Sequence, residues 1–183
     1  MLMNMKDILA VAKENKFALP AFNISDYSMF LGIMDVCEET NSPVIIEIHP
    51  DELSFIGPEM VTAIKEKAYK SPVPVCIHLD HCGDFGKIIW AIQSGFTSVM
   101  FDGAELPFEE NIEGTKKVVE AAHPVNVSVE AELGTIGSLN PEDLEGGTAK
   151  IIYTNPDDAV KFVEATGVDT LAVAIGTCHG LYP

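Results

Sequence analysis

The stretch Val73-Pro-Val-Cys-Ile-His-Leu-Asp-His81 decides how the rest of the sequence is interpreted. It begins as a β-branched, apolar run typical of a buried strand and ends in His78, Asp80 and His81. Buried strands rarely end in three ionisable groups for packing reasons alone. This density of ligand-type side chains indicates a metal or acid–base site. The alternative is a polar strand end whose groups are satisfied by neighbouring loops, so the rest of the chain has to decide between the two.

Strand patterns and helix patterns alternate on both sides of this stretch. Short β-branched runs predict strands, and apolar residues at helical spacing predict the helices between them. Strict alternation predicts a parallel sheet with helices packed outside it. The predicted strands are 17–24, 43–49, 73–80, 97–102, 126–133 and 170–175, and the predicted helices are 7–16, 26–40, 58–69, 84–94, 107–122 and 156–166.

The number of strand–helix units points to a barrel. Six units are too many for most small open sheets and two fewer than a TIM (β/α)8 barrel, which takes ~250 residues. We therefore expect an α/β fold of TIM-barrel type with only about its first six β/α units, and residues 1–183 as a single, partial domain. Segment 134–153 is rich in Gly, Pro, Asn and Glu without a clear period, which is typical of a functional loop or of disorder.

Composition excludes several function classes. The net charge is −17, so the chain should repel nucleic acid and anionic membrane surfaces. No apolar run reaches the roughly 18 residues of a membrane span. The first 16 residues lack the pattern of a signal peptide, so a cytoplasmic location is the default expectation. The four cysteines form no C-x-x-C pair, which argues against a thiolate zinc site.

The basic residues are all lysines. The sequence has 11 of them and no arginine. An anionic substrate therefore needs lysine, backbone N–H groups, a metal ion or another chain to hold it.

Ligand-type residues recur at the ends of four consecutive predicted strands. In a parallel barrel these ends share one rim, where active sites form. Two imidazoles with nearby carboxylates suit zinc or a similar divalent ion, which favours the metal interpretation. We expect two histidines to bind the metal ion. The third ligand is either a carboxylate or a residue outside this sequence. The strand-end residues are Asp80 and His81, then Asp102, then Glu132, and finally His179.

Other polar residues near the strand ends have supporting or alternative roles. His49 ends the second strand, and a hydrogen-bonded role is expected for it. His78 lies one pleat below Asp80, which favours a supporting role inside the barrel. Asn23 either contacts a ligand at the rim or serves as a turn residue. Glu130 suits a satisfied polar group in the barrel interior, and His123 an exposed residue at a helix end.

Four motifs resemble those of the class II, metal-dependent ketose-bisphosphate aldolases, which act on fructose or tagatose bisphosphate. They occur in family order, and the resemblance runs from the N-terminus to the last residue. A further segment, Tyr153-Thr-Asn-Pro156, is closer to the tagatose branch. The four motifs are Val75-Cys-Ile-His-Leu-Asp-His81, Phe96-Thr-Ser-Val-Met-Phe-Asp-Gly103, Val129-Glu-Ala-Glu-Leu-Gly134 and Leu171-Ala-Val-Ala-Ile-Gly-Thr-Cys-His-Gly180.

The resemblance implies a lyase of carbohydrate metabolism, with a place in glycolysis. It implies reversible cleavage of a ketose 1,6-bisphosphate to dihydroxyacetone phosphate and glyceraldehyde 3-phosphate, with zinc stabilising an enediolate. His81 and His179 would bind the catalytic Zn²⁺. Asp102 and Glu132 would form a second or alternate metal position. Asp80 would be the acid/base on the C4 hydroxyl.

The resemblance also implies features around this centre. Gly180 would offer its backbone to the substrate phosphate. The family leaves room for a second divalent ion and a monovalent cation, and suggests a homodimer or homotetramer. In the family a loop glutamate after strand five exchanges a proton; Asn140 stands at that spacing here, and Glu142 is the nearest substitute.

Two departures from the family pattern affect the functional prediction. Cys82 stands where a glycine is usual, which would tighten the turn after the His-x-Asp-His motif. A His-Gly-Gly-Ser-Gly segment, which carries the third zinc histidine and part of the phosphate site, is not among these residues. An alternative is therefore a catalytically incompetent fragment with partial metal binding or an assembly role. A different metal-dependent hydrolase is disfavoured by the four motifs.

Overall fold

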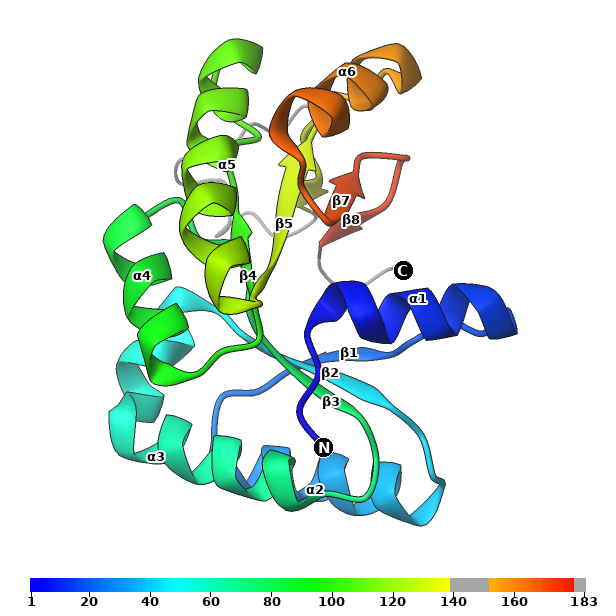
Figure 1. The fold of residues 1–183 in the computed structure, drawn as a ribbon, viewed down its shortest axis with the longest axis vertical. Helices are drawn as coiled ribbons and strands as arrows, with labels where there is room; N and C mark the ends of the chain where they lie inside the picture. The colour runs from blue at the N-terminus through cyan, green and yellow to red at the C-terminus, as the bar shows by residue number, and fades with distance from the viewer. Residues whose placement is uncertain (139–151, 180–183) are drawn as a thin grey trace.

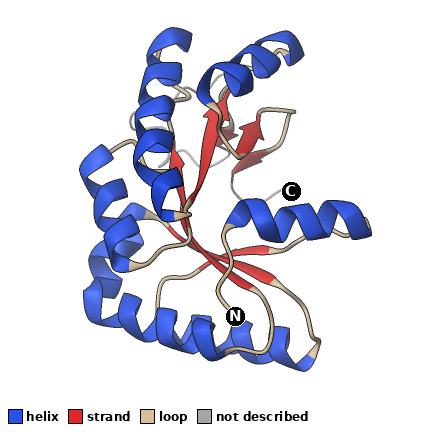
Figure 2. Ribbon diagram, viewed as in Figure 1, coloured by secondary structure: helices blue, strands red, loops and turns tan. Residues whose placement is uncertain are grey.

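The computed structural model describes residues 1–138 and 152–179. Six parallel strands in the order β1-β2-β3-β4-β5-β7 form a curled sheet with helices around it, which confirms the predicted partial TIM barrel (Figure 1, Figure 2). A second, two-stranded parallel sheet pairs β6 (Gly137–Ser138) with β8 (Cys178–His179). The six strands are β1 (Ala21–Asn23), β2 (Val44–Ile48), β3 (Val75–Leu79), β4 (Ser98–Phe101), β5 (Ser128–Leu133) and β7 (Thr170–Val173).

Most of the described α-helices begin at a residue whose side chain caps the first turn. Asp26, Asp84 and Asn155 each accept hydrogen bonds from backbone N–H groups in the first turn of the helix that follows. Gly95 and Gly167 end two helices in the left-handed conformation. The helices are α1 (Met5–Asn15), α2 (Tyr27–Glu39), α3 (Pro50–Lys70), α4 (Phe85–Ser94), α5 (Phe108–Ala122) and α6 (Pro156–Thr166), with a 3₁₀ turn, η1 (His123–Val125), after α5.

Two predicted boundaries were wrong. The helix expected from residue 58 begins at Pro50, with His49 as its N-cap. Gly57, at φ 69°, interrupts it just before Pro58, so the Gly-Pro pair imitates a helix start inside a kinked helix. The first strand, expected over 17–24, is limited to Ala21–Asn23 because it follows Pro20, which has no N–H to donate.

The two faces of the curled sheet differ in polarity. The face toward the helices is apolar and mostly buried, and it forms the main core with α2 to α6. At the lower end of the inner face, Ile45 and Cys76 pack against Met5 and Ile8 of α1. Above them the inner face becomes polar: Asn23, Glu47, His78 and Ser98 lie opposite one another on successive strands. TIM-barrel interiors are usually filled by bulky branched residues, so this polar layer marks a functional region.

A cluster around Asp169 fastens the end of the sheet where the strands begin. Its carboxylate lies 3.1 Å from Lys6 Nζ and 2.9 Å from His123 Nε2, and it accepts a hydrogen bond from Val129 N–H at 2.9 Å. His123 is exposed at the end of α5, as expected, and its ring is also paired with Asp169. These contacts join α1, η1, β5 and the start of β7. We therefore expect the cluster to stabilise the fold.

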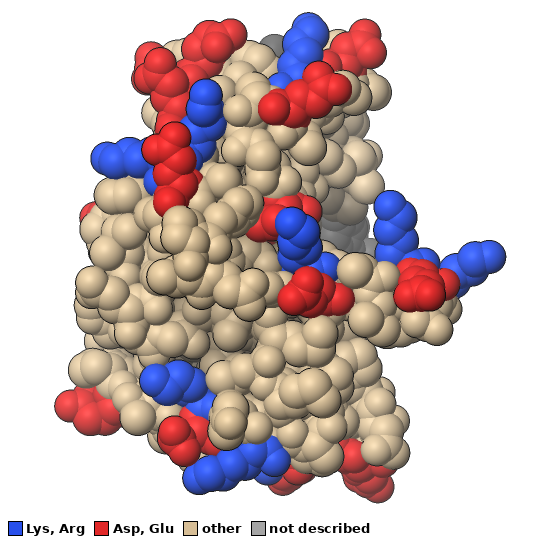
Figure 3. All heavy atoms as spheres, in the orientation of Figure 1, with Lys and Arg blue, Asp and Glu red and all other residues tan. Residues whose placement is uncertain are grey.

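The surface carries both charge signs. On the face drawn in Figure 3, lysine side chains stand beside acidic ones, and the described residues there form no basic patch. In the part of the chain that the structure describes, every helix is too short or too polar to cross a membrane.

Candidate metal and acid–base site

The turn after β3 aims Asp80 and His81 in different directions. Asp80 continues the strand, because its N–H donates to Ile48 O at 3.1 Å. His81 then adopts the left-handed conformation at φ 47°, which costs a non-glycine residue about 1–2 kcal/mol. Strain of this kind persists where the surrounding structure requires it, often at functional sites. The left-handed residue is His81 and not Cys82, whose buried thiol contacts Asp84 O; the tightening of the turn expected from Cys82 stays a prediction.

The His81 imidazole lies among three carboxylates. Its Nδ1 is 2.9 Å from Asp102 Oδ2 and 3.8 Å from Glu132 Oε2, while Nε2 is 3.9 Å from Asp80 Oδ1. One ligand atom each from His81, Asp102 and Glu132 lie within 4.8 Å of one another. Three adjacent strand ends therefore supply one nitrogen and two oxygens to a single point.

The protonation preferences of these groups reflect their contacts. The hydrogen bond to Asp102 raises the pKa of His81 to about 9, although burial opposes this. Burial would raise the pKa of Asp102, but hydrogen bonds from His81 and Ala104 N–H outweigh it and hold the pKa below its usual value. Burial, with Asp102 nearby, raises the pKa of Glu132 to about 7. The site is negatively charged and favours a cation or a proton.

Two further histidines stand beside His81. The ring of His179, from β8, meets the His81 ring nearly at right angles with 5.5 Å between ring centroids. The ring of His49, at the end of β2, lies 6.4 Å from the His81 ring. His49 Nδ1 accepts a hydrogen bond from Asp51 N–H and caps α3. The expected hydrogen-bonded role of His49 is therefore confirmed.

The residues at this point fit a divalent metal ion. Glu132 is buried, and its Oε2 has no hydrogen-bond partner among the residues that the structure describes. A buried, unpaired carboxylate oxygen is costly unless a cation or donor compensates it. Imidazole and carboxylate together are the ligand set that zinc accepts. A divalent cation held beside His81 would compensate this unpaired oxygen.

Asp80 is held from the other side by Asn23. Asn23 Nδ2 donates to Asp80 Oδ2 at 2.9 Å, which leaves Oδ1 on the side of His81. The sequence left Asn23 as either a ligand contact or a turn residue. The structure shows a contact with the predicted acid/base, and a ligand contact of Asn23 stays a prediction.

His78 occupies the barrel interior, as predicted. It is fully buried; Nδ1 lies 2.9 Å from Ser98 Oγ, and Nε2 lies 3.1 Å from Glu130 Oε2, off the axis of a hydrogen bond. Burial opposes a charge on this ring, but Glu130 outweighs it and raises the pKa of His78. Sequence reasoning treated Glu47 only as part of a strand. Its alignment with His49 on one face of β2 was the signal that could have singled it out.

The structure thus brings together most of the predicted site residues. Glu142 and Gly180 lie outside the described residues. A cavity of about 350 Å³ opens beside the cluster, with His81, Asp102 and Glu105 in its lining. The predicted residues that meet on this rim are Asn23, Asp80, His81, Asp102, Glu132 and His179.

Comparison with known proteins identifies relatives across the whole chain. The family model described as fructose-bisphosphate aldolase class-II matches residues 3–183. A Bacillus subtilis (strain 168) protein named "Probable fructose-bisphosphate aldolase" is 42% identical over 99% of the chain. A Staphylococcus aureus (strain Mu50) protein named "Fructose-bisphosphate aldolase" is 41% identical over the same share.

Solved structures share the fold. The crystal structure of the YdjI aldolase from Escherichia coli K12 superimposes with a TM-score of 0.87 at 36% identity, covering 98% of this chain and 64% of that one. The chain also spans 64% of the length of the two curated relatives.

Proposed function

Because the chain belongs to the class-II fructose-bisphosphate aldolase family, we propose that the protein catalyses the reversible aldol cleavage of a ketose 1,6-bisphosphate, fructose or tagatose. The products are dihydroxyacetone phosphate and glyceraldehyde 3-phosphate. The observation that carries the proposal is the cluster of His81 with Asp102, Glu132 and Asp80 on one rim. We take residues 1–183 as one partial TIM-barrel domain of this enzyme.

The proposed zinc ligands are His81 and His179, with Asp102 and Glu132 as a second or alternate position. Their support is the 5.5 Å approach of the two rings and the unpaired Glu132 Oε2. Zinc held there supplies Lewis-acid stabilisation of the negative charge that develops on the ketose half when the C3–C4 bond breaks. A third histidine would come from outside these residues.

Asp80 is the proposed acid/base. Its free Oδ1 accepts the proton of the C4 hydroxyl as the bond breaks and returns it on condensation. Asn23 keeps the carboxylate facing the same way through both steps. We propose Glu142 for the separate proton exchange on the dihydroxyacetone phosphate carbon, through a loop that approaches bound substrate.

Phosphate binding uses the few positive groups available. Residues 1–183 contain no arginine, so the groups that we propose for phosphate contacts within them are backbone N–H groups, with Gly180 as one contact, and lysines. We propose a homodimer or homotetramer, in which a second copy supplies further contacts. Neither nucleic acid nor a membrane is a proposed partner, since the net charge is −17.

A direct assay tests the proposed reaction. The protein as expressed in its host is incubated with fructose 1,6-bisphosphate or tagatose 1,6-bisphosphate, and the release of both triose phosphates is followed. The proposal requires equal amounts of the two products from at least one ketose. A protein that releases neither product, with zinc supplied, is not this aldolase.

A further inference from the structure

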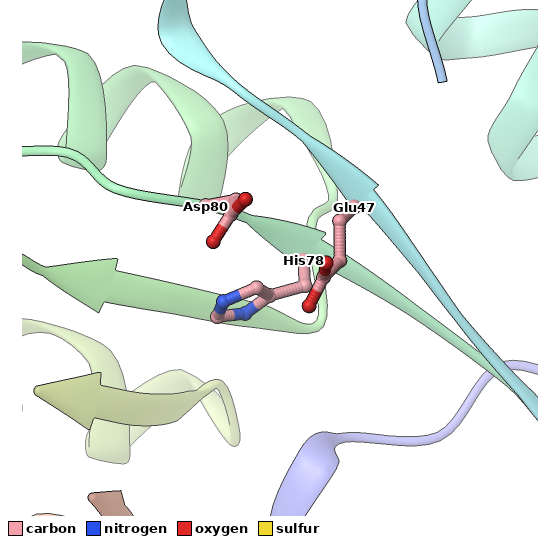
Figure 4. A group of neighbouring side chains, drawn as sticks. All are labelled: Glu47, His78 and Asp80. Carbon is pink, nitrogen blue, oxygen red and sulfur yellow. The ribbon is translucent and has the colours of Figure 1, made fainter. Parts of the chain in front are cut away.

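Glu47 is an unusual residue for the middle of a buried strand. β2 reads Val-Ile-Ile-Glu-Ile, and four of its five residues are buried aliphatic side chains. Glu47 projects from the inner face, on the same side of the sheet as His78 of β3 and Asp80 just after that strand (Figure 4). One ligand-type atom of each of these three residues lies within 4.8 Å of the others. The sequence therefore places an extra carboxyl group directly below the proposed acid/base.

The surroundings of Glu47 make this carboxyl group costly. Among the residues that the structure describes, no group donates a hydrogen bond to it. Asn23, its register partner on β1, gives its amide N–H to Asp80 instead. Asp80 and Glu130 face it with the same charge, whereas His78 and His81 oppose them. Burial, followed by Asp80, raises the pKa of Glu47 to about 7. Burial thus disfavours the ionised form of Glu47, and because the side chain keeps part of its surface exposed, a hydrogen-bond donor on a ligand can reach it and relieve that cost.

The chemistry of that ligand follows from the groups around Glu47. It has to donate hydrogen bonds and carry no negative charge, which excludes a phosphate group. A metal ion fits poorly, because both ring nitrogens of His78 already face Ser98 and Glu130. A sugar hydroxyl fits both requirements. Because Asp80 is placed against the C4 hydroxyl, the hydroxyl within reach of Glu47 is on the neighbouring carbon of the aldehyde half.

We propose that Glu47 is a specificity-determining residue that accepts a hydrogen bond from the hydroxyl next to the reacting carbon of the aldehyde half. This inference rests on the proposed aldolase function. It assigns β2 to recognition of the aldehyde, whereas the His81 cluster acts on the ketose half. In the condensation direction, the enzyme discriminates between aldehydes by that hydroxyl group, because Glu47 loses its only donor when the hydroxyl is missing.

The test compares two aldehydes in condensation with dihydroxyacetone phosphate. One is glyceraldehyde 3-phosphate, and the other is its 2-deoxy analogue, which lacks only the hydroxyl in question. The protein as expressed in its host, loaded with zinc, is compared with Glu47→Ala and Glu47→Gln. Glu59→Gln, an exposed change on α3, is the matched control. The quantity measured is the ratio of kcat/KM for the two aldehydes.

The unchanged protein should prefer glyceraldehyde 3-phosphate. Glu47→Ala should lower that preference at least about tenfold, the size of one hydrogen bond to a charged group, and leave kcat/KM for the deoxy aldehyde nearly unchanged. Glu47→Gln keeps the shape and a neutral acceptor oxygen, so it should fall between the two, and it serves as the test if the alanine variant does not fold. Glu59→Gln should leave the preference as it is.

Two results would overturn the inference while the aldolase function stands. One is a preference that both Glu47 variants retain. The other is an equal loss of kcat/KM for both aldehydes, which would mean that Glu47 acts on Asp80 and not on substrate. A protein that condenses neither aldehyde contradicts the proposed function itself, and the inference about Glu47 is rejected with it.

Discussion

Asn23 Nδ2 donates a hydrogen bond to Asp80 Oδ2 over 2.9 Å, and this contact links the ends of β1 and β3 across β2. One oxygen of Asp80 is thereby occupied and the other faces the His81 side. The orientation of the proposed acid/base depends on a residue two strands away, so that residue should affect the rate of reaction.

Replacing Asn23 with alanine should lower kcat about 10- to 100-fold, because a catalytic group displaced by about 1 Å loses that much. KM should change little, because the side-chain contact that the structure shows for Asn23 is with Asp80. Steady-state kinetics of ketose cleavage measure both constants. A variant with normal kcat and a raised KM would show instead that Asn23 binds substrate directly.

Asp80→Ala should lower kcat by about 10²- to 10⁴-fold, the usual contribution of a general acid or base. The zinc content of the purified variant should match that of the unchanged protein, because Asp80 is not among the proposed ligands. Metal analysis alongside kinetics checks both statements. Loss of zinc together with activity would identify Asp80 as a ligand.

Zinc affinity should rise with pH up to about 9. Zinc binds neutral imidazole, whereas the metal-free His81 has its pKa raised to about 9 and stays protonated below that pH. Each pH unit from 6 to 9 should therefore strengthen binding by at least about tenfold, until the affinity levels off. Competition against a chromophoric chelator measures this. Asp102→Asn should move the plateau to lower pH; an affinity independent of pH in this range would exclude His81 as a ligand.

Asp169→Asn should destabilise the fold by about 2 kcal/mol, because it weakens hydrogen bonds to a buried charge. Contacts with Val129 N–H, His123 and Lys6 outweigh burial and lower the pKa of Asp169 below 3.8. The contribution is therefore complete above about pH 4 and lost as the pH falls through the folded-state value. Urea unfolding at several pH values measures it.

Glu66→Gln, which breaks the exposed Lys70–Glu66 ion pair, is the control for that experiment and should have little effect. If Asp169→Asn were equally harmless at pH 7, the Asp169 cluster would not be a source of stability.

The rim of the sheet could be predicted from the sequence because the strand ends are marked by local patterns. Alternating strand and helix signals define a parallel sheet, and the strand ends of such a sheet share one edge. Asp80, His81, Asp102 and Glu132 could therefore be grouped without coordinates. The roles proposed for them still await experiment.

Other features depend on contacts that no local pattern contains. His123 and Asp169 are 46 residues apart and meet only when η1 and the residue before β7 come together in the fold. Glu47 was overlooked because the rest of β2 is apolar on both faces, and only its spacing of two residues from His49 marked it as inward-facing. The start of α3 was misplaced because Gly57-Pro58 carries the signal of a helix start within a kinked helix.

Removal and return of the metal ion test the central claim most directly. The protein as expressed in its host is dialysed against EDTA until metal analysis finds no zinc, and cleavage of fructose and tagatose 1,6-bisphosphate is measured before dialysis, after it and after zinc is added back. We predict that cleavage is abolished by dialysis and restored by stoichiometric zinc. Full activity in the verified metal-free protein would contradict the account.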